Sequence, residues 1–290
     1  MAISNLNLTV AADQACISMG RHIAKIMPFA HSLNSEAARK GTVVRVPKYA
    51  AAAAEFSTAE GSENTYAQTT GVAGADVTLD KHPVAGFAAG DTELMGADVS
   101  FVRDAGVAAG RAIARYIEGL FMGMPKSGVS GIKTATLAAT KAGFVGLYKT
   151  AMDNDIDPAE AVLVLNPTYY AALLNAAGDV NVIGTEALAK GVFQGGFAGF
   201  PLVECSASLA TDVVGFIAEK GAMAFAARAI EEPVKGAYPQ WGAVQDPATG
   251  APVTLLQFVD LDTGTAHVTC TCQFGCAILD AAHVVYLTAA

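Results

Sequence analysis

The chain has 290 residues, of which 52% are hydrophobic and 16% are charged, and its formal net charge at pH 7 is −9. This composition excludes intrinsic disorder, because disordered chains are poor in apolar residues and rich in charge, and five cysteines exclude a small disulfide scaffold. Soluble domains usually carry ~25% charged residues, so we expect something other than water to cover a large share of this surface.

Neither a membrane nor a secretory signal explains the low charge. The longest uncharged stretch near the ~18 residues that a membrane span needs is Ala161–Gly178, and Asn166-Pro167 interrupts it. The N-terminus lacks the basic start and apolar run of a secretory signal, and the free cysteines fit a reducing compartment. Extensive protein–protein contact is therefore the explanation that we favour.

The charge is unevenly distributed along the chain. Residues 1–50 hold two acidic side chains and six basic ones, a net charge of +4, whereas the remainder holds 12 basic and 25 acidic residues, a net charge of −13. The six basic residues are Arg21, Lys25, Arg39, Lys40, Arg45 and Lys48. A basic segment on an acidic body can contact nucleic acid or the acidic face of a neighbouring copy, and we favour the neighbour because the excess charge is small.

Residues 1–40 have few large apolar side chains. Steps of three or four between Cys16, Met19, Ile23 and Ile26 predict a short helix over Ala11–Met27. We expect this region to be an arm that lies on another surface.

Two predicted strands enclose a long polar connection. Thr42–Tyr49 and Asp76–Phe87 are rich in β-branched residues, and a proline in each marks an edge strand, so they are natural antiparallel partners. Between them Ala50–Ala75 is too long for a loop inside a compact domain and cannot be stable alone. We therefore expect it to be disordered or to extend as an arm onto another molecule. Its acidic and aromatic side chains are Glu55, Phe56, Glu60, Glu63 and Tyr66.

The clearest helical pattern spans Thr92–Met122, where apolar residues recur at steps of three or four. At ~1.5 Å per residue such a helix would be about 45 Å long. This is longer than a compact domain of this size normally needs.

The second half mixes helices and strands, which indicates an α+β or α/β unit. Residues 137–152 fit an amphipathic helix, Ala161–Leu165 is a buried strand, and Asn166 and Pro167 can start a helix that runs through Ala177. Further predicted strands are Leu202–Cys205, two short strands within Gly215–Ile230, Pro252–Asp260, Thr265–Leu279 and Ala282–Leu287.

No constellation of residues supports catalysis, a cofactor or a metal. Cys270, Cys272 and Cys276 share the apolar face of one predicted strand, as buried free cysteines do, while His267 falls on the other face. Asp153, Asp155 and Asp157 resemble the start of a calcium loop, but Pro158 stands where the motif needs glycine. We predict that the chain is not an enzyme. A thiol hydrolase remains the enzymatic alternative.

The order of these parts resembles the major capsid protein of tailed bacteriophages, with the HK97-like fold that encapsulin shells share. The likeness covers nearly the whole chain. The segments that carry it are GTVVRVPKYA (Gly41–Ala50), VTLDKHPVAGF (Val77–Phe87), the long helix Thr92–Met122, VLVLNPTYYAAL (Val162–Leu173) and the C-terminal strands within Val253–Leu287.

The resemblance implies an α+β capsid fold with named parts. These are an N-terminal arm (1–40), an extended β-hairpin loop (41–88), the spine helix of a peripheral domain (89–125), an axial domain (126–232) and peripheral strands (233–290). Arg39, Lys40, Arg45, Lys48, Glu55, Phe56, Glu60, Glu63 and Tyr66 are then candidates for contacts between subunits. Because the chain begins near the arm, a separate scaffolding protein or a processed precursor is expected. Some members of this family crosslink their subunits through a Lys–Asn isopeptide bond. Because no asparagine follows Asn181 in this chain, we expect no such crosslink.

The implied function is assembly into the icosahedral shell of a tailed phage around double-stranded DNA. The implied partners are copies of the chain in pentamers and hexamers, a scaffolding protein, a portal, a possible decoration protein and non-specifically held DNA, with no membrane. The implied location is the virion capsid, after assembly in the host cytoplasm. The alternatives are an encapsulin-type compartment or another virion protein such as a tail tube.

Overall fold

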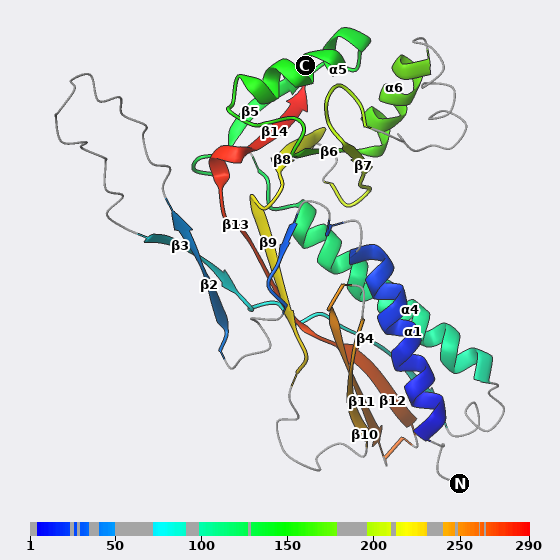
Figure 1. The fold of residues 1–290 in the computed structure, drawn as a ribbon. Helices are drawn as coiled ribbons and strands as arrows, with labels where there is room; N and C mark the ends of the chain where they lie inside the picture. Colours follow the sequence, from blue (N-terminus) through cyan, green and yellow to red (C-terminus); the bar gives the residue numbers. More distant parts are fainter. Residues whose placement is uncertain are drawn as a thin grey trace.

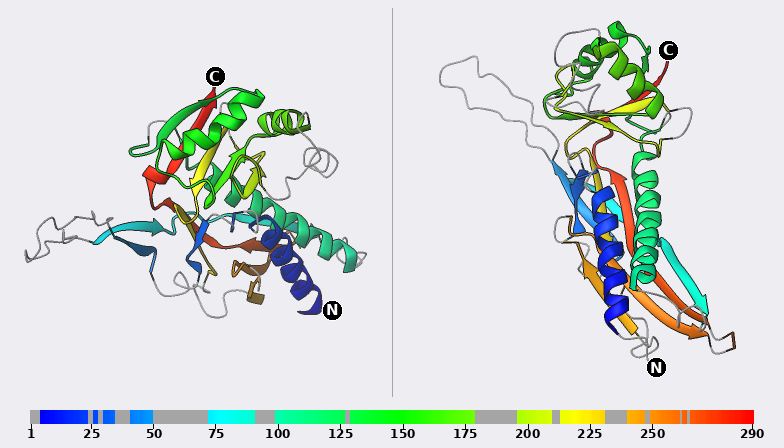
Figure 2. Two further views of the ribbon diagram at one scale, coloured as in Figure 1. Left: turned by 45° about the horizontal axis from the view of Figure 1, so that its top comes forward. Right: turned by 90° about the vertical axis from the view of Figure 1, so that its right-hand side faces the viewer.

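The computed structural model describes residues 5–23, 26–27, 30–34, 41–49, 72–90, 99–126, 129–178, 196–209, 213–230, 240–246, 249–260, 262–263 and 265–290. It is an elongated α+β molecule (Figure 1). The helices α5 and α6 lie at one end, and α1 and α4 lie over strands at the other (Figure 2). We call these the upper and lower lobes.

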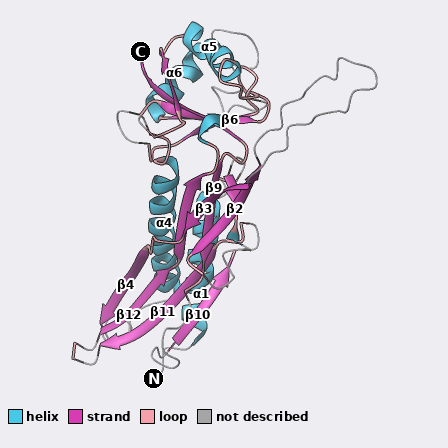
Figure 3. Ribbon diagram, turned by 90° about the vertical axis from the view of Figure 1, so that its left-hand side faces the viewer, coloured by secondary structure: helices cyan, strands magenta, loops and turns pink. Residues whose placement is uncertain are grey.

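In the lower lobe, α1 (Asn5–Ile23) and α4 (Val99–Met122) pack side by side against an antiparallel sheet (Figure 3). In sheet order its strands are β10 (Gln240–Gln245), β11 (Pro252–Asp260), β12 (Thr265–Thr271) and β4 (Val84–Gly90). Apolar residues at helical spacing form the buried stripes, such as Met19 and Ile23 in α1 and Ile113 and Ile117 in α4. The expectation that residues 1–40 lie on another surface is therefore wrong for α1, which is part of this chain's own core.

Glycines allow the two helices to approach closely. A Cβ atom added to Gly106 would lie 2.4 Å from the carbonyl oxygen of Ala11, and one added to Gly110 would lie 2.3 Å from that of Ala15. Real Cβ atoms do not come so near, so even alanine on α4 would push α1 away from the core.

The upper lobe contains a mixed five-stranded sheet. In sheet order its strands are β5 (Lys133–Leu137), β14 (Val284–Ala289), β8 (Gly215–Glu219), β6 (Ala161–Leu165) and β7 (Leu202–Cys205). The pairs β5–β14 and β6–β7 are parallel, whereas β14–β8 and β8–β6 are antiparallel. The helices α5 (Lys141–Met152) and α6 (Pro167–Gly178) belong to this lobe, and the side chain of Asn166 caps α6 by accepting a hydrogen bond from the Tyr169 amide.

Both faces of this sheet are buried at its inner strands β14, β8 and β6, which explains why these strands are apolar runs without alternation. The edge strand β5 is mostly exposed. On one face Leu163, Ile217 and Val285 pack with residues of α5 and α6. On the other face Val164 and Phe216 join the core that contains α1 and α4. The sheet therefore belongs to both cores.

A short central sheet connects the lobes, in the order β1 (Ala30–Ser32), β9 (Met223–Arg228) and β13 (Gln273–Ile278). Strand β13 leads through the 3₁₀ turn η1 (Ala281–His283) directly into β14. The carboxylate of Asp280 accepts a hydrogen bond from the Ala282 amide, and Nδ1 of His283 lies 2.7 Å from a carboxylate oxygen of Glu219. The turn between β13 and β14 is thus fixed by the contacts of Asp280 and His283.

Three predicted strand assignments need correction. Asp76–Phe87 is two strands, β3 (Val72–Thr78) and β4, because the chain leaves the first partner strand before Pro83 and joins β12. Thr265–Leu279 is likewise divided at Cys272 into β12 and β13, which lie in different sheets. The expectation that all strands after residue 233 complete the peripheral sheet is wrong for β14, which lies inside the upper sheet between β5 and β8.

Within the described part of the chain, no helix has both the length and the apolar composition to cross a membrane.

Substitution of Gly110 by alanine should lower the free energy of unfolding, because the added methyl group meets the backbone of α1. Overpacking of this kind costs about 1–3 kcal/mol. Gly119→Ala on the same helix is the matched control. A Cβ atom at Gly119 meets nothing within 4 Å, so the better helix propensity of alanine should raise stability by up to ~1 kcal/mol. Urea unfolding of the unassembled subunit measures the free energy of unfolding of both variants. Equal unfolding midpoints for the two variants would contradict the close packing of α1 on α4.

Candidate subunit interfaces

The first candidate interface is a hairpin that stands apart from both lobes. Strands β2 (Val43–Tyr49) and β3 pair antiparallel from Val43 opposite Thr78 to Tyr49 opposite Val72, and they form a separate two-stranded sheet. Figures 1 and 3 show it beside the central strands, with its Tyr49–Val72 end directed away from the body. A two-stranded sheet is marginally stable alone in water, so its stability depends on what it packs against.

The base of the hairpin is clamped to the central sheet. Val77 and Leu79 are buried in a small cluster with Leu33, Ala224 and Ala226. The carbonyl oxygen of Thr78 would lie only 2.2 Å from a Cβ at position 275, so the glycine there allows β3 and β13 to touch. The backbones of Lys81 and Phe274 also exchange two hydrogen bonds, of 3.0 and 2.8 Å.

Arg45, a predicted contact residue, already has a partner within the chain. Its Nε donates a hydrogen bond of 2.9 Å to Oδ1 of Asp76, the residue directly opposite on β3. The two side chains are 73% and 45% exposed, and such surface pairs contribute about 0–1 kcal/mol. Arg45 therefore fits the register of the hairpin and adds little to its stability.

Most of the other predicted contact residues lie outside the described residues: Arg39, Lys40, Glu55, Phe56, Glu60, Glu63 and Tyr66. The backbone of Lys48 lies in β2, but the structure does not describe its side chain. The basic residues of the first 50 positions do not form one patch within the described chain, because Arg21 lies on α1 and Arg45 lies on the hairpin.

A second candidate interface, on α5, was missed by the sequence analysis. Val145, Tyr148 and Met152 are 56%, 47% and 52% exposed and lie on one side of the helix. Phe144 and Leu147, on the adjacent side, are buried in the upper core. The sequence pattern predicts an amphipathic helix over residues 137–152 but does not separate a buried from an exposed apolar side; the helix begins at Lys141, and Leu137 ends β5. The sequence does contain one indication of this surface. Apolar residues extend around much of this helix, which is typical of a helix covered on more than one side.

Three of the five cysteines, Cys16, Cys270 and Cys272, are buried, and Cys205 and Cys276 are half-buried. Burial raises the pKa of Cys272 to about 12 and those of Cys270 and Cys276 to about 11. Burial, together with the nearby carboxylates of Asp246 and Asp13, also raises the pKa of Cys16 to about 11. Such thiols remain protonated near neutral pH, and the thiolate is the form that attacks electrophiles or binds metals. Among the described residues, no three His, Cys, Asp or Glu side chains gather as a metal site.

These pKa values predict slow labelling by a thiol reagent at pH 8. A thiol with a pKa of about 11 is only ~0.1% ionised there, so Cys16, Cys270, Cys272 and Cys276 should react at least ~100-fold more slowly than in urea-unfolded protein. A Cys205→Ser variant isolates these four thiols from the fifth cysteine, which is half-buried. Fast, stoichiometric labelling of one thiol in that variant would contradict the raised pKa values and would favour a thiol enzyme.

Comparison with known proteins gives no sequence match: neither a protein-family model nor a curated protein matches the chain. Solved structures do match. A structure of Mycobacterium phage Che8 aligns with a TM-score of 0.58 at 14% identity, over 89% of this chain and 88% of that one. A virus-like particle from Pyrococcus furiosus aligns with a TM-score of 0.55 at 15% identity, over 95% and 98%.

The capsid structure of the cyanophage P-SCSP1u aligns with a TM-score of 0.54 at 14% identity, over 87% of this chain and 84% of that one. The chain has the HK97-like fold. The expected α+β class and fold are therefore confirmed. Within this HK97-like chain, the projecting hairpin and the apolar side of α5 are two surfaces that its own described residues leave uncovered.

Proposed function

We propose that the chain is a major capsid protein, which assembles into the icosahedral shell of a tailed phage around double-stranded DNA. The observation that carries this proposal is the extent of the structural likeness. The matches to a phage, a phage capsid and a virus-like particle each cover at least 84% of both chains, so the likeness concerns a whole subunit. The hairpin and the low charged fraction agree with a subunit that is completed by its neighbours.

The physical basis of assembly is burial of apolar surface on several sides of each subunit. A standard interface of ~1,600 Å² has a gross favourable contribution of roughly 40 kcal/mol at ~25 cal/mol per Å². Most of this is offset by the cost of association and of ordering side chains. A closed shell holds each subunit through several such contacts at once, so individually weak contacts suffice.

In this proposal the lobes take different places in the shell. The upper lobe is the axial part, where copies meet in pentamers and hexamers, and the lower lobe is the peripheral part. The hairpin carries the chain between Tyr49 and Val72 onto a neighbouring subunit. A scaffolding protein, a portal and a possible decoration protein are the further partners, and assembly takes place in the host cytoplasm before the protein is found in the virion.

The second candidate is an encapsulin-type compartment that encloses protein cargo. The match to the Pyrococcus furiosus virus-like particle, which covers 98% of that chain, supports this second candidate. The content of purified particles separates the two, because a phage capsid holds DNA and a compartment holds a cargo protein. Tubes in place of closed shells would favour a tail protein.

Shortening the hairpin connection should abolish shells without unfolding the subunit. Because Tyr49 and Val72 are paired, residues 50–71 can be replaced by Asn-Gly, which closes a two-residue hairpin turn. We expect a soluble protein with unchanged circular dichroism and no closed particles by negative-stain electron microscopy. Normal shells from this variant, expressed with the same partners as the wild type, would contradict the role of the hairpin.

Charges on the exposed side of α5 should also impair assembly. We expect Val145→Asp with Met152→Asp to leave the fold intact, since both side chains are more than half exposed. Burial of each in an interface would contribute about 1.5–3 kcal/mol, and an unpaired charge there would be costly. Sedimentation should show free subunits or capsomers for this variant. The single-charge control Asn175→Asp, at an exposed position of α6, should assemble. Shells from the double variant at wild-type yield would show that this side of α5 is not an interface.

A further inference from the structure

The outer side of the α1–α4 pair carries arginines that pair with no other described residue. Arg21 on α1 and Arg111 and Arg115 on α4 are exposed, and none makes an ion pair or hydrogen bond with another described residue. Nearer the start of α4, Nε of Arg103 lies 3.5 Å from Oδ1 of Asp104. The exposed acidic residues described on these helices are Asp13 and Asp104. Both carboxylates share this side, since Asp13 lies about two turns from Arg21 and Asp104 about two turns from Arg111. Four arginines and two carboxylates leave a net charge of +2 on the described part of this side, although the chain as a whole has a net charge of −9.

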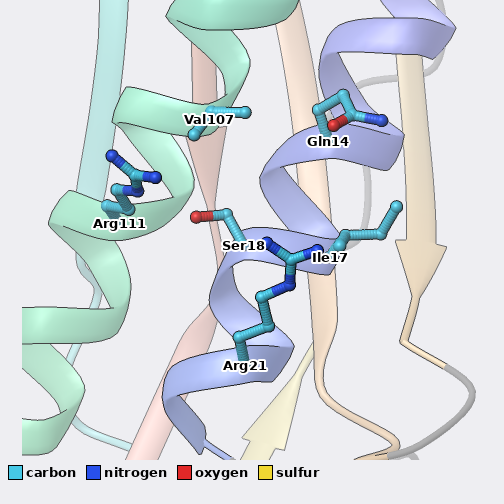
Figure 4. Close-up of a pocket in the computed structure, with 6 residues that line it drawn as sticks. All are labelled: Gln14, Ile17, Ser18, Arg21, Val107 and Arg111. Atoms are coloured by element: carbon cyan, nitrogen blue, oxygen red, sulfur yellow. The ribbon is translucent and has the colours of Figure 1, made fainter.

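Two of these arginines line a groove between the helices. Its residues are Gln14, Ile17, Ser18, Arg21, Val107 and Arg111, and its volume is about 140 Å³ (Figure 4). In this view the Ser18 hydroxyl lies between the side chains of Arg21 and Arg111. Pockets that enclose a small molecule usually measure ~300–1,000 Å³, so this groove suits one small group better than a whole metabolite.

The donors around the groove match a phosphate group. Each guanidinium presents several N–H donors in a planar fork that fits phosphate oxygens, and Ser18 and Gln14 can add a hydroxyl and an amide donor. The cations continue beyond the groove, since Arg115 follows Arg111 by about one helical turn, or ~6 Å. A line of cations suits a polymeric anion better than a single ion.

We propose that this side of the α1–α4 pair binds the phosphate backbone of double-stranded nucleic acid, with Arg21 and Arg111 holding one phosphate in the groove. The proposal rests on the proposed function, which brings a polyanion next to a shell of acidic subunits. Such subunits repel DNA unless the surface facing it is locally positive. Duplex DNA carries one charge per ~1.7 Å of its axis, so phosphates lie within reach of every arginine in the line. Contact through phosphates alone makes the binding independent of base sequence.

The test measures binding of a fluorescein-labelled 20-base-pair duplex of arbitrary sequence by anisotropy, as a function of salt. The variant is Arg21→Gln with Arg111→Gln and Arg115→Gln. The control, Lys141→Gln with Lys149→Gln and Lys220→Gln, removes the same charge from exposed positions of the upper lobe. Each lost phosphate contact lowers the slope of log K against log salt by ~0.9. We expect the arginine variant to lose about 2.7 of slope and at least tenfold in affinity at ~0.1 M salt, and the control to keep both.

A variant with lysine at the same three positions keeps the charges and should keep the slope. Loss of the slope there would overturn the proposal, because charge would not be the cause. Equal slopes for the wild type and the glutamine variant would also overturn it. So would arginine-dependent binding of polyglutamate without binding of the duplex, which would assign the surface to an acidic protein. Electron microscopy of the same samples reports shell formation separately, so failure of DNA binding is distinguishable from failure of the capsid proposal.

Discussion

The burial of one five-stranded sheet on both faces is the constraint on which the rest of the structure depends. Its alternating side chains belong to two cores, with Leu163 facing α5 and α6 and Val164 facing the core that contains α1 and α4. An apolar strand such as Ala161–Leu165 is stable only if both layers are present. The lobes are therefore not independently folding units joined by a linker, and the orientation of α5 relative to the lower lobe is set by side-chain packing.

The candidate contact surfaces are attached to this rigid body in different ways. The hairpin is held at its base by Val77, Leu79 and the close approach of β3 to β13 at Gly275. The exposed apolar side of α5 is held by the burial of the adjacent side of the same helix. The cationic side of the α1–α4 pair depends on the glycine contacts that bring the helices together. Each surface is thus positioned by backbone packing behind it.

Much of the fold could be predicted from local sequence patterns. The buried strand Ala161–Leu165, the capping of α6 by Asn166 and the strand Pro252–Asp260 depend on neighbouring residues and agree with the predictions. The long helix ends at Met122 as predicted, but α4 begins at Val99 and not at Thr92. Sheet membership was not predictable in this way. The division at Cys272, the place of β14 between β5 and β8, and the packing of α1 on α4 are decided by contacts between segments far apart in the chain.

The candidate interfaces were harder to predict for the same reason. Val145 and Phe144 are both apolar residues in a helical pattern. Only the side of α5 that meets the sheet decides that Phe144 is buried and Val145 is exposed. Arg45 is a predicted contact residue between subunits, but its cross-strand neighbour Asp76 becomes known only when the register of β2 and β3 is known.

Strand β13 gives the molecule a mechanical property. It touches the base of the hairpin at Gly275, and within ten residues the same chain segment enters the middle of the upper sheet as β14, through a turn fixed by Asp280 and by the contact of His283 with Glu219. An extended strand and a short pinned turn transmit tension with little slack. We therefore expect a pull on the base of the hairpin to reach the upper sheet along this backbone segment, without any helix having to unfold.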